Sequence, residues 1–592
     1  MPAGRPLKQD SAAISDSTSG DPWRRPLMAA AAAILALGAL AIWRLGNVAR
    51  SGQVTINDSL LVLQDGAVVF GFLAFYALLY LRTPQLSAEL ANRLQTLAGR
   101  AGASFAIGLA VLAAAAALVG WTWLYQAFPM SMDEFWPTFD ARVFAAGRLM
   151  APVASEWRPY AHAMQPYYQL ETPDHAFWIS SYLPLNAAAR SLASYLGAEG
   201  LAGAAWAAAA ILLLWDVARR LWPERRDAAV VAVSLLALSP QFLAAAMTPF
   251  AWPAHLALNL AWLALFLRQN RRAQAGAAIA AVAACGLHEW IFAPLFAGPF
   301  LAQAWLSGRR RAAALQAAAF VLACGFWLAW PGLVFVAHGY PFAAARMKAA
   351  ENALANLLIP AAPSVMAENL LRLIAWQAPL AAPLALAGIV EAVRCRSTFL
   401  LAMAVGLVVI VLFLGAVTPF QAQGWGYRYL HGYLGSISLL AAAGWIRLSD
   451  AAPRRSWSVL VVGAAVALVV VLPIRADQMR LYVSPSVRFE RMIRRSPADV
   501  VLVDPANSLF WIDLVRNDPF LVAHPKVMSL RALTRSQIVE LGSRRSLELF
   551  VVRQRQGCLA PVGVTPGSGL HPLGPARCEP EGRRYALEQI EN

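Results

Sequence analysis

The sequence predicts an α-helical polytopic membrane protein, and three observations support this fold class. The 592 residues are 59% hydrophobic and only 14% charged, with a mean hydropathy of +0.52, whereas soluble domains carry about 25% charged residues. About twelve apolar runs approach or exceed the ~20 residues that a membrane-spanning helix needs. Arginines cluster in the short segments between these runs, which is typical of loops retained in the cytoplasm during insertion.

The apolar runs predict about thirteen spans. Residues 273–306 form a run too long for one span, with arginines on both sides, so we expect two short helices joined by a hairpin. The other predicted spans lie near residues 27–43, 60–81, 102–124, 201–218, 228–247, 250–267, 312–336, 373–393, 399–417, 429–446 and 457–474.

The arginine-rich loops predict a cytoplasmic N-terminus, and an odd number of spans then places the C-terminus on the other face. We expect a disordered cytoplasmic tail (1–26), a transmembrane domain (27–474) and a C-terminal α/β domain (475–592). In that last domain, residues 499–504 and 547–553 have strand-like patterns and residues 534–541 a helix-like one. A bacterial inner-membrane protein with this orientation has its C-terminal domain in the periplasm.

The formal charge of +16 does not indicate a nucleic-acid partner, because most arginines belong to the loops between spans. Cys558 and Cys578 lie in the polar C-terminal region, where a periplasmic environment favours a disulfide between them. Cys285, Cys324 and Cys395 show no ligand spacing and are expected to be small buried side chains.

An adjacent acidic pair, Asp133–Glu134, directly follows the third apolar run and begins the first large periplasmic loop (125–200). Carboxylates at a membrane interface are costly to desolvate, so the pair favours a chemical role. Apolar residues at helical spacing within 139–150 predict a helix lying flat on the membrane surface. The alternative is that the pair only caps the N-terminus of that helix.

Aromatic and polar residues alternate further along the chain. The stretch 157–168 includes His162 and Tyr167, and a second surface helix is expected at 181–190. Trp425 and Tyr427 lie beside Arg428 just before a predicted span. Such aromatics suit stacking on sugar rings, and they equally suit anchoring at the membrane interface.

Four segments carry a resemblance to a known family: Asp133-Glu134 followed by Ala141-Arg142 and Gly147-Arg148, then Leu238-Ser-Pro-Gln-Phe242 with Trp252-Pro-Ala-His255, then Gly286-Leu-His-Glu-Trp290, and finally Trp425-Gly-Tyr-Arg-Tyr-Leu430. In order and sidedness this pattern resembles the GT-C glycosyltransferase superfamily. Within it, the pattern is similar to the bacterial branch of protein O-mannosyltransferases and the lipid A aminoarabinose transferase. The resemblance covers about residues 100–450.

The resemblance implies a glycosyltransferase (enzyme class 2.4) that moves a sugar from a polyprenyl-phosphate donor to an acceptor hydroxyl, with inversion, at the periplasmic face. It implies Asp133 as the general base, with Glu134 orienting the acceptor or helping to hold Mg²⁺ or Mn²⁺. Cations expected near the donor phosphate are Arg428, Arg142, Arg346 and Lys348. For Arg428, simple snorkelling to the interface is the alternative. The acceptor class stays open among glycan, lipid and protein.

One segment departs from the family pattern. Where relatives commonly have Thr-Arg-Pro or Thr-Lys-Gly, this chain has His288-Glu289. A protonated His288 would replace the missing cation, or the pair would bind acceptor or metal; a structural hydrogen bond is the alternative. His255 is expected to line the substrate cavity.

Three other functions are compatible with a chain of this composition. A transporter or flippase of lipid-linked sugars predicts inverted repeats, which the sequence does not show. A polysaccharide polymerase or ligase predicts a long arginine-rich loop late in the chain, whereas the large loop here comes early. A catalytically silent family member remains an alternative because of His288-Glu289.

Overall fold

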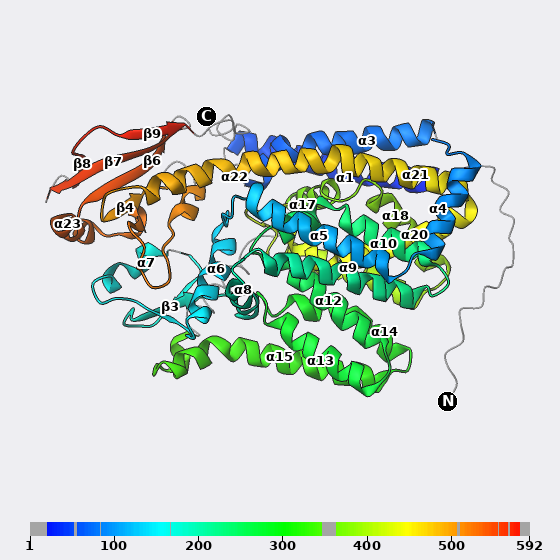
Figure 1. The fold of residues 1–592 in the computed structure, drawn as a ribbon, viewed down its shortest axis with the longest axis horizontal. Helices are drawn as coiled ribbons and strands as arrows, with labels where there is room; N and C mark the ends of the chain where they lie inside the picture. The colour runs from blue at the N-terminus through cyan, green and yellow to red at the C-terminus, as the bar shows by residue number, and fades with distance from the viewer. Residues whose placement is uncertain are drawn as a thin grey trace.

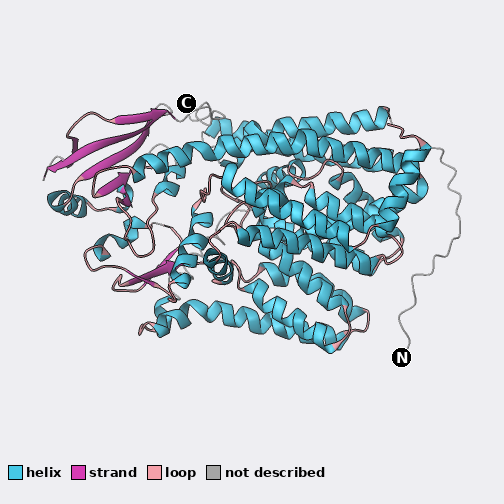
Figure 2. Ribbon diagram, in the orientation of Figure 1, coloured by secondary structure: helices cyan, strands magenta, loops and turns pink. Residues whose placement is uncertain are grey.

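A computed structural model describes residues 21–51, 56–82, 84–165, 167–345, 363–505, 509–553, 556–565 and 569–580. Long helices run side by side through most of the molecule, and a β-sheet lies beyond one end of this bundle (Figures 1 and 2). Because apolar helices dominate and the larger sheet forms a small C-terminal domain, the predicted fold class is confirmed.

Seven helical segments of the described chain are long and apolar enough to cross a membrane: 24–48, 58–81, 103–123, 201–221, 310–337, 398–417 and 453–494. They include α1 (Arg24–Ser51), α3 (Gly66–Leu81), α5 (Ala103–Trp123), α9 (Leu201–Leu221), α15 (Arg310–Ala337), α19 (Thr398–Val417) and α21 (Pro453–Val466). An eighth arises if α10 (Arg226–Ala237) and α11 (Pro240–Ala246), bent by 60°, count as one span.

The expected count of about thirteen spans is not confirmed. Several predicted spans form short helices, namely α12 (Trp252–Leu267), α13 (Arg271–Cys285), α14 (Phe292–Leu306) and α18 (Ala381–Arg394). At 1.5 Å per residue, such helices are shorter than the ~30 Å hydrocarbon layer. The bundle therefore contains both complete spans and short helices, and the short helices pack against neighbouring helices of the bundle.

Two details of the bundle bear on the prediction. The expected hairpin within 273–306 is confirmed, since α13 and α14 are separated by a turn at residues 286–291. The expected continuous span at 373–393 is wrong, because α17 (Pro363–Ala375) ends before Pro379 and α18 begins after it. The residue before a proline avoids helical backbone angles, which favours a break at this position.

Close packing holds α18 against α20 (Leu434–Ala451), the helix that directly follows residues 428–433. A Cβ atom on Gly388 would lie 1.8 Å from the carbonyl oxygen of Leu440, and one on Gly444 would lie 2.0 Å from that of Leu384. Only glycine fits at these two contacts, so the backbones approach directly, as is common between membrane helices.

A small layer of short elements lies between the bundle and the C-terminal sheet (Figure 1). It contains α6 (Met132–Ala145), α8 (Leu185–Tyr195) and an antiparallel sheet of order β1-β3-β2. These strands are β1 (Ala151–Pro152), β2 (Gln169–Glu171) and β3 (Phe177–Ser180). The first predicted surface helix, at 139–150, therefore begins earlier than expected, and the acidic pair lies inside its first turn.

The C-terminal sheet has the order β5-β4-β6-β7-β8, with β9 also paired to β7. The strands are β4 (Val500–Val503), β5 (Lys526–Ser529), β6 (Leu547–Arg553), β7 (Gln556–Thr565), β8 (Gly569–Pro572) and β9 (Arg577–Pro580). β4 is parallel to β5 and β6, and the remaining pairs are antiparallel. A disulfide joins Cys558 and Cys578, which lie opposite each other on β7 and β9.

The predicted strands at 499–504 and 547–553 correspond to β4 and β6, and the predicted helix corresponds to α23 (Arg535–Arg544). α22 (Leu472–Arg494) continues from the last membrane-spanning segment to this sheet without a break. A rigid helical connection of this kind fixes the sheet beside the end of the bundle (Figure 1).

Candidate active site

An ion pair between Asp133 and Arg428 joins two segments that are 295 residues apart. Arg428 Nη1 donates to Asp133 Oδ2 at 2.6 Å, and the side chains are 8% and 13% exposed respectively. Asp133 lies in the first turn of α6, and Arg428 begins the 3₁₀ helix η3 (Arg428–Tyr433). Removing two charges from water is costly, so a largely buried pair is weak evidence for stability and fits a chemical role better.

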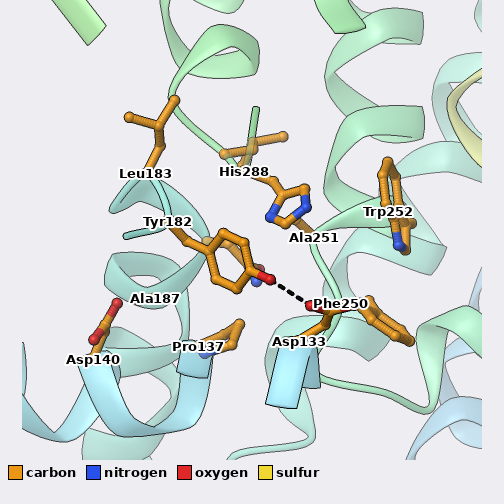
Figure 3. A pocket seen from close by; sticks show the side chains of 12 residues that line it. Asp133, Pro137, Asp140, Tyr182, Leu183, Ala187, Phe250, Ala251, Trp252 and His288 are labelled. Carbon is orange, nitrogen blue, oxygen red and sulfur yellow. Dashed lines mark hydrogen bonds between the residues drawn. The ribbon is translucent and has the colours of Figure 1, made fainter. Parts of the chain in front are cut away.

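The two members of the acidic pair have different surroundings. The Ser131 hydroxyl accepts a hydrogen bond from the Glu134 N–H and caps α6. Glu134 Oε2 accepts from the Met130 N–H at 2.5 Å, so this carboxyl belongs to the helix start. Asp133 makes no such contact and faces a pocket instead (Figure 3). Capping therefore accounts for Glu134 and not for Asp133.

Tyr182 holds the other oxygen of the Asp133 carboxylate. Its hydroxyl donates to Asp133 Oδ1 (Figure 3), while its ring stacks on Tyr168 at 5.3 Å and contacts His288 at 4.4 Å between ring centroids. The sequence did not indicate Tyr182 as a site residue, because nothing in its spacing connects it to Asp133.

A narrow pocket that is partly open to solvent lies in front of Asp133. Its walls combine carboxylates, an imidazole and aromatic rings with a few aliphatic groups (Figure 3). They come from Asp133, Pro137, Asp140, Tyr182, Leu183, Asn186, Ala187, Phe250, Ala251, Trp252, Leu287 and His288. A few polar groups converging in a mainly apolar pocket are typical of a small-molecule site.

Burial and charge act in opposite directions on Asp133. Burial raises its pKa, but the charge of Arg428 and the hydrogen bond from Tyr182 lower it more, so the pKa lies below the ordinary 3.8. For Arg428, burial lowers the pKa, but Tyr429 and Asp133 raise it above its ordinary value. Both groups are therefore charged at neutral pH.

His288 lines the pocket beside Asp133. Burial lowers its pKa to about 4, although the charge of Asp133 acts against this shift. At neutral pH the imidazole is therefore neutral, and it offers the pocket one donor and one acceptor. Glu289 is exposed and is not among the pocket residues.

Arg428 is surrounded by aromatic rings, with its guanidinium carbon 5.2 Å from the ring centre of Phe250 and 5.1 Å from that of Tyr429. Its backbone N–H donates to Gln421 Oε1 at 3.0 Å, which fixes the loop. Among the described residues, its buried Nε has no hydrogen-bond partner. This donor is thus available to an anionic ligand.

The two aromatics flanking Arg428 are buried in the protein. Trp425 donates to the Tyr125 hydroxyl and packs on Trp376 with ring centres 5.3 Å apart. Tyr427 is fully buried and its hydroxyl contacts Met366. Neither residue is among those that line the pocket, so they support the Arg428 loop.

The remaining predicted site residues lie apart from the ion pair. His162 Nε2 is 2.8 Å from the carbonyl oxygen of Ala532, Tyr167 is half-exposed, and Arg142 faces Glu199 at 3.8 Å on the surface. His255 is buried behind Trp252, with ring centres 5.7 Å apart. Arg346 and Lys348 lie outside the described residues.

The carboxylates of Asp133 and Glu134 have separate partners, Arg428 and the Met130 N–H, and a joint Mg²⁺ or Mn²⁺ site completed by a substrate phosphate stays a prediction. Within the part of the chain that the structure describes, no group of three His, Cys, Asp or Glu side chains is arranged to hold a metal ion.

The neighbouring Glu134 provides a test of these electrostatics. Burial raises its pKa from 4.5 to about 8, despite the bond from Met130 and the charge of Arg516. The unfolded chain releases this proton near pH 4.5 and the folded chain only near pH 8, so the associated stability is lost as pH rises through this window. We expect thermal unfolding in detergent to show that Glu134→Gln gains stability over the wild type across this range. A difference that does not vary with pH would contradict the assignment.

No protein-family model matches the sequence, and no curated protein sequence matches it either. The fold is similar to ArnT from Cupriavidus metallidurans bound to undecaprenyl phosphate, with 15% identity, a TM-score of 0.48, and coverage of 75% of this chain and 93% of that chain. It is also similar to the apo state of the same protein, with 14% identity, a TM-score of 0.46, and coverage of 75% and 92%. At this identity the similarity concerns the fold alone.

Proposed function

We propose that the chain is a membrane glycosyltransferase of the GT-C kind, which moves a sugar from a polyprenyl-phosphate donor to an acceptor hydroxyl. The observation that carries the proposal is the Asp133–Arg428 ion pair at the pocket. Asp133 lines the pocket and Arg428 is bonded to its carboxylate. A carboxylate suits the acceptor hydroxyl, and a guanidinium beside it suits the donor phosphate.

Asp133 acts as the general base in this proposal. The acceptor oxygen attacks the anomeric carbon while the bond from that carbon to the phosphate oxygen breaks, so the configuration inverts. The electron pair of the broken bond leaves with the phosphate, and the hydroxyl proton moves to Asp133. Because the hydroxyl becomes acidic only as the new bond forms, a carboxylate with a low pKa accepts the proton late in the step.

Arg428 compensates the charge of the leaving group. The donor phosphate carries one negative charge and the released polyprenyl phosphate carries about two, so a fixed cation stabilises the transition state more than the substrate. The unpartnered Nε of Arg428 supports this role. When phosphate binds, it replaces Asp133 as the partner of the guanidinium, which frees the carboxylate and raises its basicity.

The placement of charges supports a periplasmic site in a bacterial inner membrane, with a cytoplasmic N-terminus. The arginine-bearing turns after α9, α12 and α14 lie at the end of the bundle away from the C-terminal sheet (Figure 1). Cytoplasmic loops retain positive charge, so the pocket and the sheet would face the periplasm. There a disulfide such as Cys558–Cys578 is stable.

The experiment that tests this proposal is transfer from a panel of radiolabelled polyprenyl-phosphate sugars in membranes that contain the protein. We expect label to enter a membrane or periplasmic glycan, lipid or protein acceptor, and mass analysis then identifies both sugar and acceptor. Lipid binding without transfer from any donor would overturn the proposal in favour of a transporter or a silent family member.

A further inference from the structure

One carboxylate from the C-terminal region joins the two segments that carry the ion pair. Asp513, on the 3₁₀ helix η5 (Leu509–Leu514), accepts from the Met132 N–H through Oδ1 at 2.9 Å. Its Oδ2 accepts from Gln423 Nε2 at 2.6 Å. Met132 directly precedes Asp133, and Gln423 lies in the loop that leads to Arg428. Both oxygens of one side chain are thus used to connect the two halves of the site.

A second side chain from the same segment strengthens the contact with α6. Arg516 Nη2 donates to the Met130 carbonyl oxygen at 3.0 Å, and its guanidinium lies 4.3 Å from the Phe128 ring centre. Arg516 is 2% exposed, so this contact is protected from solvent. The chain from Asp513 to Arg516 therefore holds the start of α6 from the side of the C-terminal sheet.

Asp133 and Arg428 each lie at the start of a helix that follows an irregular segment. Residues 124–131, ahead of α6, and residues 418–427, ahead of η3, contain no helix or strand. The hydrogen bond from Trp425 to the Tyr125 hydroxyl joins these two segments directly, and the Asp513 carboxylate joins them through Met132 and Gln423. Figure 1 shows α6 between the sheet and the bundle.

We propose that Asp513 is a positioning residue, which sets the separation of Asp133 and Arg428 and makes the C-terminal domain an integral part of the active site. Its catalytic consequence rests on the proposed glycosyl transfer. A displacement of about 1 Å in a reacting geometry costs on the order of 10²-fold in rate, so a bond that fixes this separation has a large effect without contacting substrate.

The test compares Asp513→Ala and Asp513→Asn with Arg545→Ala. Arg545 pairs with Glu156 and lies over the Trp157 ring at 4.0 Å, so it also attaches the C-terminal domain to the first large loop, but it makes no contact with Met132 or Gln423. Loss of Asp513 should lower kcat by about 10²-fold with little change in the KM for donor. Asparagine keeps one acceptor oxygen and should lose about tenfold, whereas Arg545→Ala should stay within about twofold. Equal losses in Asp513→Ala and Arg545→Ala, or a near wild-type rate for Asp513→Ala, would overturn the proposal.

Hydrogen exchange gives a readout that does not need activity. In Asp513→Ala, peptides covering residues 128–136 and 420–428 should both exchange faster than in the wild type, and in Arg545→Ala they should not. Unchanged exchange in Asp513→Ala would refute the positioning role of Asp513, whatever the activity of the variant. If the two variants show the expected exchange pattern but the wild type transfers no sugar, the proposed function is contradicted and the positioning role of Asp513 still stands.

Discussion

Replacing Asp133 with asparagine is expected to lower kcat by about 10³-fold, because the variant has no group that accepts the acceptor proton. Asparagine has the size of aspartate and still accepts the hydrogen bond that Tyr182 donates. Arg428 loses its counterion, so its guanidinium is more available to phosphate, and the KM for donor should stay constant or fall. Steady-state rates over a range of donor concentrations measure both quantities.

Glu134→Gln is the matched control, since it makes the same chemical change one residue along the helix. Glu134 accepts from the Met130 N–H, and glutamine keeps that acceptor. Its carboxyl is also protonated at neutral pH, because burial raises the pKa to about 8. Activity within a few-fold of the wild type is expected for this variant. Equal losses in both variants would mean that Asp133 acts through the helix start and not as a base.

Replacing Arg428 is expected to have the second largest effect. Removal of one preorganised donor at a developing charge costs roughly 3 kcal/mol, which corresponds to about 10²-fold in kcat/KM. Arg428→Lys keeps the charge but loses the forked geometry and the Nε donor, so it should recover only part of the activity. Arg428→Ala should also weaken inhibition by free polyprenyl phosphate.

The Arg428→Lys variant distinguishes the role of Arg428 in stabilising the leaving phosphate from its contribution to protein stability. Arg428→Ala leaves Asp133 unpaired in a largely buried position, which destabilises a protein by about 3–5 kcal/mol. Arg428→Lys avoids an unpaired charge, so a kinetic defect in a variant with near wild-type unfolding belongs to the site. Unchanged transfer and unchanged phosphate inhibition in both variants would assign Arg428 to interface anchoring.

Much of the fold follows from local sequence patterns. Residues 273–306 were predictable as a hairpin because their length and flanking arginines exclude a single span. The strands β4 and β6 were predictable from short β-branched runs. The number of spans was not predictable in the same way. The break around Pro379, for example, interrupts an apolar segment whose composition does not change.

The site was predictable only where a charge stands out from its surroundings. Asp133 and Arg428 are ionisable groups in apolar or aromatic segments, and such residues indicate a functional site. Tyr182 and Asp513 were missed because they are ordinary in their own segments and reach Asp133 and its neighbour Met132 across 49 and 381 residues. The packing of Trp425 and Tyr427 inside the protein was not predictable, because an aromatic residue beside a membrane suits stacking on sugars, anchoring and core packing equally.

The measurement that tests the central claim most directly is single-turnover cleavage of a labelled polyprenyl-phosphate sugar by wild type and Asp133→Asn, with bound donor quantified in the same samples. The expected result is equal or greater donor occupancy in Asp133→Asn, with cleavage slower by about 10³-fold. Cleavage at the wild-type rate at equal occupancy would contradict the role of Asp133 as the general base.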